Sequence, residues 1–239
     1  MKLCKKIFWL TTFSIAMGFL EAIVVVYLRV IYYPGGFEFP IQMPSNKIFL
    51  TEVIREICTI VMLLSIAVLI GKNKETVFAW FIMSFGIWDI FYYIALKLFL
   101  DWPASLLTWD ILFLIPVTWL GPVLAPILCS ITMILLASVI LYYQNKNGQE
   151  ILAKKDTLIL IIGAFLIFVA FTWNYTKLLI SYDLIMRMFV PGTEDKVKEI
   201  FLNYVPGSFF WELFSFGIML IYFELGVMIL KCYQKNEKF

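Results

Sequence analysis

The feature that most constrains this chain is a series of long apolar stretches with almost no charge. Three stretches carry no charged side chain, namely Ile57–Ile70, Ile111–Tyr143 and Thr157–Thr176. The whole chain is 62% hydrophobic and only 15% charged, and a soluble domain of 239 residues would need more polar surface. A helix crosses the hydrocarbon core with about 20 apolar residues, all of its backbone hydrogen bonds being internal. The sequence therefore predicts an all-α fold, a polytopic transmembrane helical bundle forming a single integral membrane domain.

We expect about six spans, preceded in one case by a half-helix or re-entrant segment. Their approximate bounds are 7–30, 51–71, 76–98, 122–143 (with the half-helix at 104–116 before it), 157–179 and 209–231. The first stretch follows three lysines, as a signal peptide would. Its apolar run continues past Glu21 to Leu28, which favours a membrane span over a cleaved leader.

The half-helix is predicted from the length of the run Ile111–Tyr143. Its 33 residues would make a helix of roughly 50 Å, longer than a hydrocarbon core of about 30 Å. Pro116, Gly121 and Pro122 supply breaks. Non-helical backbone at membrane depth is tolerated only where protein buries it or where it lines a water-filled space.

Positive charges predict the orientation. Six passes place 11 lysines and arginines on the side of the termini and 5 on the other, leaving out Arg29, Arg55 and Lys177 at span borders. A seventh pass would make the split 8 to 8. The positive-inside rule therefore favours six passes with cytoplasmic termini, and we expect a bacterial cytoplasmic membrane. A short interfacial helix is expected on the outer side, with Thr193 as its N-cap.

Cofactor chemistry is restricted by the absence of histidine. Without it the chain has no histidine-ligated haem, zinc or copper and no serine–histidine nucleophile. The four cysteines form no C-x-x-C pair. No cofactor is indicated, and Mg²⁺ is considered only for an enzyme. The expected partners are the lipid bilayer, a small-molecule or lipidic ligand, and another copy or a partner subunit; nucleic acid is not expected.

Ionisable side chains inside the spans mark the candidate site, since each costs at least about 2.5 kcal/mol at a helix centre. Most lie in the half of the bundle predicted to face outward. The candidate cavity residues are Glu21, Glu52, Arg55, Glu56, Asp89, Tyr93, Lys97 and Asp110. One hypothesis is that they converge on a polar, carboxylate-lined cavity. The alternative is that the acids pair with basic residues such as Arg29 and Lys97, and only lock the bundle together.

Spacing refines this prediction on the third span. Asp89, Tyr93 and Lys97 follow one another at four-residue intervals, which predicts a polar stripe on one side of the helix. Gly86 precedes Asp89 by three residues and would allow a neighbouring helix to come close. Glu224, nearer the cytoplasmic side, is interpreted as a carboxyl that is protonated or paired with a lysine.

Three functions remain open. Broken helices and embedded carboxylates favour a carrier for a small solute, with proton coupling. The same carboxylates and several tryptophans would suit an intramembrane enzyme acting on a lipid or isoprenoid-linked substrate. Small size and the lack of cofactor ligands would suit an accessory subunit of a larger membrane complex.

Overall fold

A computed structural model describes residues 3–40, 42, 45–148, 150–182, 200 and 203–236 of the chain. Its elements are α1 (Leu3–Tyr32), α2 (Asn46–Ile70), α3 (Lys74–Leu100), β1 (Trp109–Phe113), β2 (Trp119–Pro122), α4 (Leu124–Asn147), α5 (Lys154–Ser181) and α8 (Trp211–Asn236). Within the described residues, six helices are long and apolar enough to cross a membrane. The fold is thus mostly helical and compatible with a multi-pass membrane protein, and membrane insertion itself stays a prediction.

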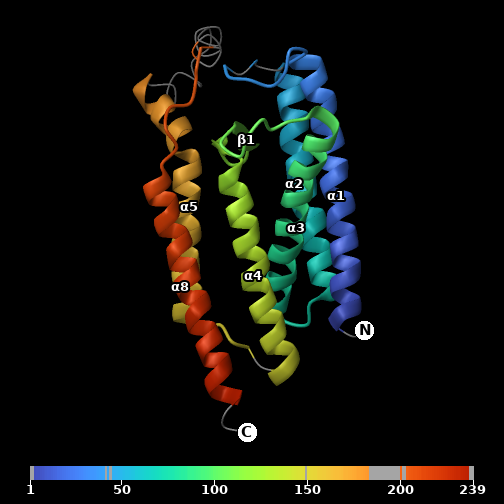
Figure 1. Cartoon of the computed structure of the whole chain (residues 1–239), viewed down its shortest axis with the longest axis vertical. Helices are drawn as coiled ribbons and strands as arrows, with labels where there is room; N and C mark the ends of the chain where they lie inside the picture. The colour runs from blue at the N-terminus through green and yellow to red at the C-terminus, as the bar shows by residue number, and fades with distance from the viewer. Residues whose placement is uncertain are drawn as a thin grey trace.

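The helices run side by side along the long axis, in two groups joined by α4. Figure 1 shows α5 and α8 as one pair, α1, α2 and α3 as a second group, and α4 between them. The two strands lie at one end of the bundle, which we call the hairpin end. Both chain ends lie at the other, which we call the terminal end. There, an apolar cluster that includes Leu10, Trp80, Ile140 and Met228 fills the space between helices from both groups.

Glycines set the closest helix contacts. A Cβ placed on Gly18 would lie 2.7 Å from the Trp88 carbonyl oxygen, and one placed on Gly86 would lie 2.7 Å from the Ser130 carbonyl oxygen. Gly163 and Gly217 bring α5 and α8 together in the same way. In lipid, helices gain little from hydrophobic burial against one another, so small residues that permit close packing stabilise the bundle.

The segment before α4 forms a β-hairpin, so the predicted half-helix at 104–116 is wrong and the fold is not purely helical. β1 pairs with β2 in antiparallel orientation, with Asp110 opposite Gly121 and Trp109 opposite Pro122. Pro116 interrupts the helical path and biases the residue before it toward extended backbone. The aromatic residues on either side of the turn suit strands. The hairpin lies between the helices above α4 (Figure 1).

The other predicted elements agree in number and position where the structure describes them. The six long helices begin and end within several residues of the bounds predicted for the spans, and α1 is the longest of the described helices, at 30 residues. The N-terminus of α3 is fixed by a capping box between Asn73 and Thr76. The interfacial helix expected from Thr193 lies outside the described residues.

Candidate functional site

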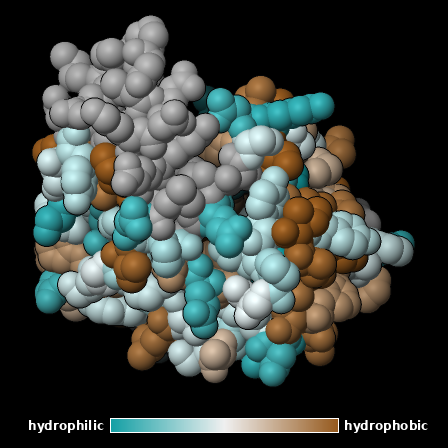
Figure 2. Space-filling model, turned by 90° about the horizontal axis from the view of Figure 1, so that it is seen from above, coloured by the Kyte–Doolittle hydropathy of each residue, from teal (hydrophilic) through white to brown (hydrophobic). Residues whose placement is uncertain are grey.

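A cavity of about 850 Å³ lies in the hairpin half of the bundle. Its wall includes residues of all six helices and of the hairpin. Seven of the eight candidate residues line it, and these are Glu21, Glu52, Arg55, Glu56, Asp89, Tyr93 and Asp110. The volume lies within the range of about 300–1,000 Å³ typical of small-molecule sites. Seen from the hairpin end, the surface mixes hydrophilic and hydrophobic residues (Figure 2).

A buried ion pair attaches the hairpin to α1, and a hydrogen bond attaches it to α3. Arg29 Nη2 lies 3.0 Å from Asp110 Oδ1, the Tyr93 hydroxyl donates to Asp110 Oδ2 at 3.2 Å, and the Ile111 N–H also donates to the carboxylate. The guanidinium lies 3.7 Å from the centre of the Trp102 ring and 4.5 Å from that of Phe37. With partners on both oxygens of Asp110, this group mainly holds the hairpin in place.

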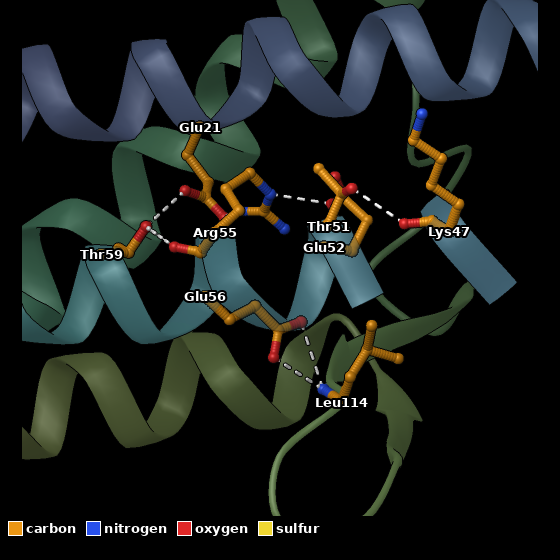
Figure 3. A network of polar contacts seen from close by, with 8 residues as sticks. All are labelled: Glu21, Lys47, Thr51, Glu52, Arg55, Glu56, Thr59 and Leu114. Carbon is orange, nitrogen blue, oxygen red and sulfur yellow. Dashed lines mark hydrogen bonds and ion pairs between the residues drawn. The ribbon is translucent and has the colours of Figure 1, made fainter. Parts of the chain in front are cut away.

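A second charged network joins α1 to α2. Arg55 forms ion pairs with Glu21 of α1 and, through Nε at 2.8 Å, with Glu52 of its own helix. The Thr59 hydroxyl donates to Glu21 Oε2 at 3.0 Å. Figure 3 shows Arg55 between the two carboxylates. One guanidinium thus pairs with two carboxylates. For these residues the structure agrees with the alternative that the acids pair with basic residues and hold the helices together.

Glu56 connects α2 to the turn of the hairpin. Both of its carboxylate oxygens accept the Leu114 N–H, at 3.2 and 2.9 Å, and the side chain points toward that turn (Figure 3). Among the described residues, no lysine or arginine forms an ion pair with Glu56. The hydrogen bonds give this buried carboxyl a positioning role for the hairpin backbone.

Asp89 is the least satisfied carboxylate of the cavity. The Ser130 hydroxyl of α4 donates to its Oδ2 at 2.7 Å. The close approach of the helices at Gly86 brings Ser130 into reach, as the spacing predicted. No described cation pairs with Asp89, which is buried with 8% of its surface exposed. This carboxylate meets only a neutral partner inside an apolar bundle.

Lys97 does not line the cavity. Its ammonium lies 2.7 Å from Asp101 Oδ1 and also donates to the carbonyl oxygens of Asp101 and Pro103 at the end of α3. The same ammonium holds the pKa of Asp101 below its usual range. The predicted stripe therefore divides: Asp89 and Tyr93 reach the cavity, and the third member stabilises a solvent-exposed loop.

Several lining residues were not among the predicted site residues. Arg29 was set aside as a border residue, although its position eight residues after Glu21 predicts the same face of α1. Ser130 gave no signal beyond its place in an apolar run. At the rim, Tyr33 accepts the Gln42 N–H at 2.8 Å, and burial raises the pKa of its phenol.

Comparison with known proteins yields no relative for this arrangement. We found no protein family model, no curated protein and no solved structure that matches the chain. Within the described residues, no group of three or more cysteine, aspartate or glutamate side chains is arranged to hold a metal ion.

Proposed function

We propose that this protein is a membrane carrier for a small solute, and that Asp89 couples solute binding to a proton. The observation that carries the proposal is the placement of Asp89. It is a buried carboxylate on the wall of an 850 Å³ cavity and has a hydroxyl as its neutral partner. A charge in an apolar bundle is costly unless it is neutralised by a proton or a bound cation. Exchange between these two states would link the solute to the proton.

The proposal includes an orientation. Both termini lie in the bacterial cytoplasm, and the hairpin end, with the cavity beneath it, faces outward. The excess of positive charge on the side of the termini supports this arrangement. Non-helical backbone inside the bundle, as in the hairpin, is a feature of carriers whose binding sites lie between broken elements.

Solute-driven proton movement in proteoliposomes tests the proposal. The purified protein is reconstituted with a pH-sensitive dye in the lumen and exposed to panels of organic cations, amino acids, sugars and organic anions. We expect at least one class to change the lumenal pH, and the Asp89→Asn variant to lose the response. Asp101→Asn is the matched control, because Asp101 lies outside the cavity in the left-handed backbone region that asparagine tolerates. No response from any class, or a response that Asp89→Asn retains, would contradict the proposal.

A second function is favoured by the depth of the cavity. Beyond Asp89, the wall is apolar and is built from Leu136, Ala164, Ile218 and Ile221, which would suit an acyl or isoprenyl chain. An intramembrane enzyme using Asp89 as general acid or base would need this shape. Incubation of the proteoliposomes with a bacterial lipid extract, followed by mass spectrometry, distinguishes the two: an enzyme converts a lipid, and a carrier leaves the lipid composition unchanged.

A further inference from the structure

The charge balance of the cavity favours a cationic ligand. Its described wall carries five carboxylates and two guanidinium groups. Arg29 and Arg55 account for three of these carboxylates through ion pairs, and Glu56 accepts backbone hydrogen bonds. Asp89 is the one carboxylate of the described wall that has neither an ion pair nor a hydrogen bond from another residue's backbone. An anionic ligand would meet an excess of like charge, whereas a cation would meet an unpaired opposite charge.

Asp89 has a carboxylate oxygen available to such a ligand. Ser130 occupies Oδ2, and no described residue donates a hydrogen bond to Oδ1. Asp89 is one of the residues that line the cavity, and 8% of its surface is exposed. Its carboxylate can therefore be reached from the cavity, where a ligand would compete with no described donor for Oδ1.

Four aromatic residues line the same cavity as Asp89 and contact one another in sequence. Trp88 lies 6.2 Å from Phe113 of the hairpin, Phe113 lies 5.8 Å from Trp119, and Trp119 lies 5.1 Å from Phe168 of α5, all measured between ring centres. The rings thus form a continuous surface from α3 through the hairpin to α5. A cation over such faces gains about 0.5–2 kcal/mol, more where water is excluded.

We propose that the cavity binds a lipophilic organic cation, with its charge beside Asp89 and its apolar body against the Trp88–Phe113–Trp119–Phe168 wall. This inference rests on the proposed function and names the chemical class of its solute. A cation whose charge is shielded by hydrocarbon loses little hydration on entry, so it suits a cavity with one free carboxylate and many apolar neighbours. A strongly hydrated metal ion or a sugar would leave the apolar wall unused.

Protons compete with this ligand for Asp89. The titratable groups that act on its carboxylate are Asp110, which Arg29 pairs, and the side chains of Tyr92, Tyr93 and Cys129. Tyrosine and cysteine ordinarily titrate above about pH 8. The other charged groups on the wall, on α1 and α2, are Glu21, Glu52, Arg55 and Glu56. Affinity for the cation should therefore rise as the pH is raised through the range in which Asp89 loses its proton, because the neutral carboxyl offers the cation no charge.

A pair of probes with one shape and opposite charge tests the inference. Radiolabelled tetraphenylphosphonium and tetraphenylborate are titrated against the protein in nanodiscs, with empty nanodiscs as the blank for partition into lipid. We expect saturable binding of tetraphenylphosphonium, tighter at higher pH, and no saturable binding of tetraphenylborate. Equal binding of both ions, or binding of the anion alone, would overturn the inference.

Three variants attribute the binding to Asp89. Asp89→Asn should weaken tetraphenylphosphonium binding by at least about tenfold and remove its pH dependence, because the unpaired charge is lost. Asp89→Glu keeps the charge and should bind within a few-fold of the wild type, and Asp101→Asn should bind like the wild type. If Asp89→Asn does not fold, the retained affinity of Asp89→Glu and the pH dependence of the wild type decide the question.

The two proposals fail in different ways. If tetraphenylphosphonium does not bind while another solute class drives Asp89-dependent proton movement, the cation inference is wrong and the carrier function stands. If the cation binds at Asp89 and no solute moves protons, the cavity is a binding site and the carrier function is wrong. Unaltered binding by Asp89→Asn would overturn the assignment of the site to this residue.

Discussion

The hairpin end and the terminal end of the bundle contain the same kinds of buried polar contact. At the hairpin end Asp110 pairs with Arg29, and Glu56 accepts the Leu114 N–H. At the terminal end Asp156 pairs with Lys231 at 2.5 Å, and the carboxylate of a helix residue, Glu75, accepts the Ile151 N–H at 3.0 and 3.1 Å.

The two ends differ in what surrounds these contacts. The cavity wall contains Arg29, Glu56 and Asp110, and none of the described acids of the terminal end belongs to it. At the terminal end Glu224 lies near Asp156 and Lys231, but the lysine forms its ion pair with Asp156. A buried carboxylate is therefore not by itself a sign of function. Asp89 and Glu224 are both buried acids without a described ion pair, and Asp89 differs because it lines the cavity.

The largest difference in stability is expected from removing one basic residue at each end. Arg29→Ala should lower the free energy of unfolding by about 3–5 kcal/mol, because it leaves Asp110 buried without its ion-pair partner. Lys231→Ala should cost less, since its side chain is 34% exposed and Asp156 keeps the Ala153 N–H. Thermal unfolding in detergent measures both, and an equal loss would mean that the two ion pairs are equivalent.

An added methyl group should have different effects at the close contact between α3 and α4 and at the one between α5 and α8. Gly86→Ala should destabilise the protein by about 1–3 kcal/mol, since the new Cβ would meet the Ser130 backbone oxygen at 2.7 Å. Gly163→Ala should cost less, because the backbone atom closest to its new Cβ, the Gly217 carbonyl oxygen, lies at 3.0 Å, and the contact at 2.8 Å is with the side chain of Ile221. The same unfolding assay applies, and the reverse order would show that the α3–α4 contact adapts more readily than the α5–α8 contact.

The two carboxylates that hold backbone segments provide a matched pair. Glu56→Ala and Glu75→Ala should each cost about 1.5–3 kcal/mol, because each removes the charged acceptor of a backbone hydrogen bond. Limited proteolysis should then show cleavage near Leu114 in the first variant and near Ile151 in the second. Cleavage at the same new site in both would show that neither contact acts locally.

The smallest effect on stability is expected at Asp89. Asp89→Asn should change the free energy of unfolding by less than about 1 kcal/mol, because an asparagine oxygen still accepts from Ser130 and no buried cation loses a partner. Asp110→Asn should cost clearly more, since Arg29 would keep its burial and lose its ion pair. A large loss at Asp89 would identify it as a structural residue of the same kind as Asp110.

The sequence predicted the helices better than the segment between them. Apolar length and charge bias are properties of the chain itself, so the six long helices could be predicted directly. The hairpin could not, because a short apolar stretch rich in aromatic residues suits a strand as well as a helix. Its pairing of Trp109 with Pro122 also depends on contacts between its polar groups and the neighbouring helices.

The site shows the same limit. The high cost of charge in lipid indicated most of the charged residues on the cavity wall, and helical spacing predicted that Asp89 and Tyr93 share a face. Spacing could not show that Lys97 turns to the end of α3, because its partners are the left-handed residue Asp101 and Pro103, which lie beyond the helix. Gly86 predicted that a neighbouring helix could come close, but no local pattern identified Ser130 as the residue that this contact brings to Asp89.

The hairpin also has a mechanical consequence. Glu56 attaches it to α2, Asp110 attaches it to α1, and packing of Phe171 against Gly121 attaches it to α5, where an added Cβ would lie 3.1 Å from the ring. The first two attachments are charged and directional, whereas the third is an apolar surface that can slide. If the two groups of helices separate, the hairpin should move together with α1 and α2, and its contact with α5 should be the one that opens.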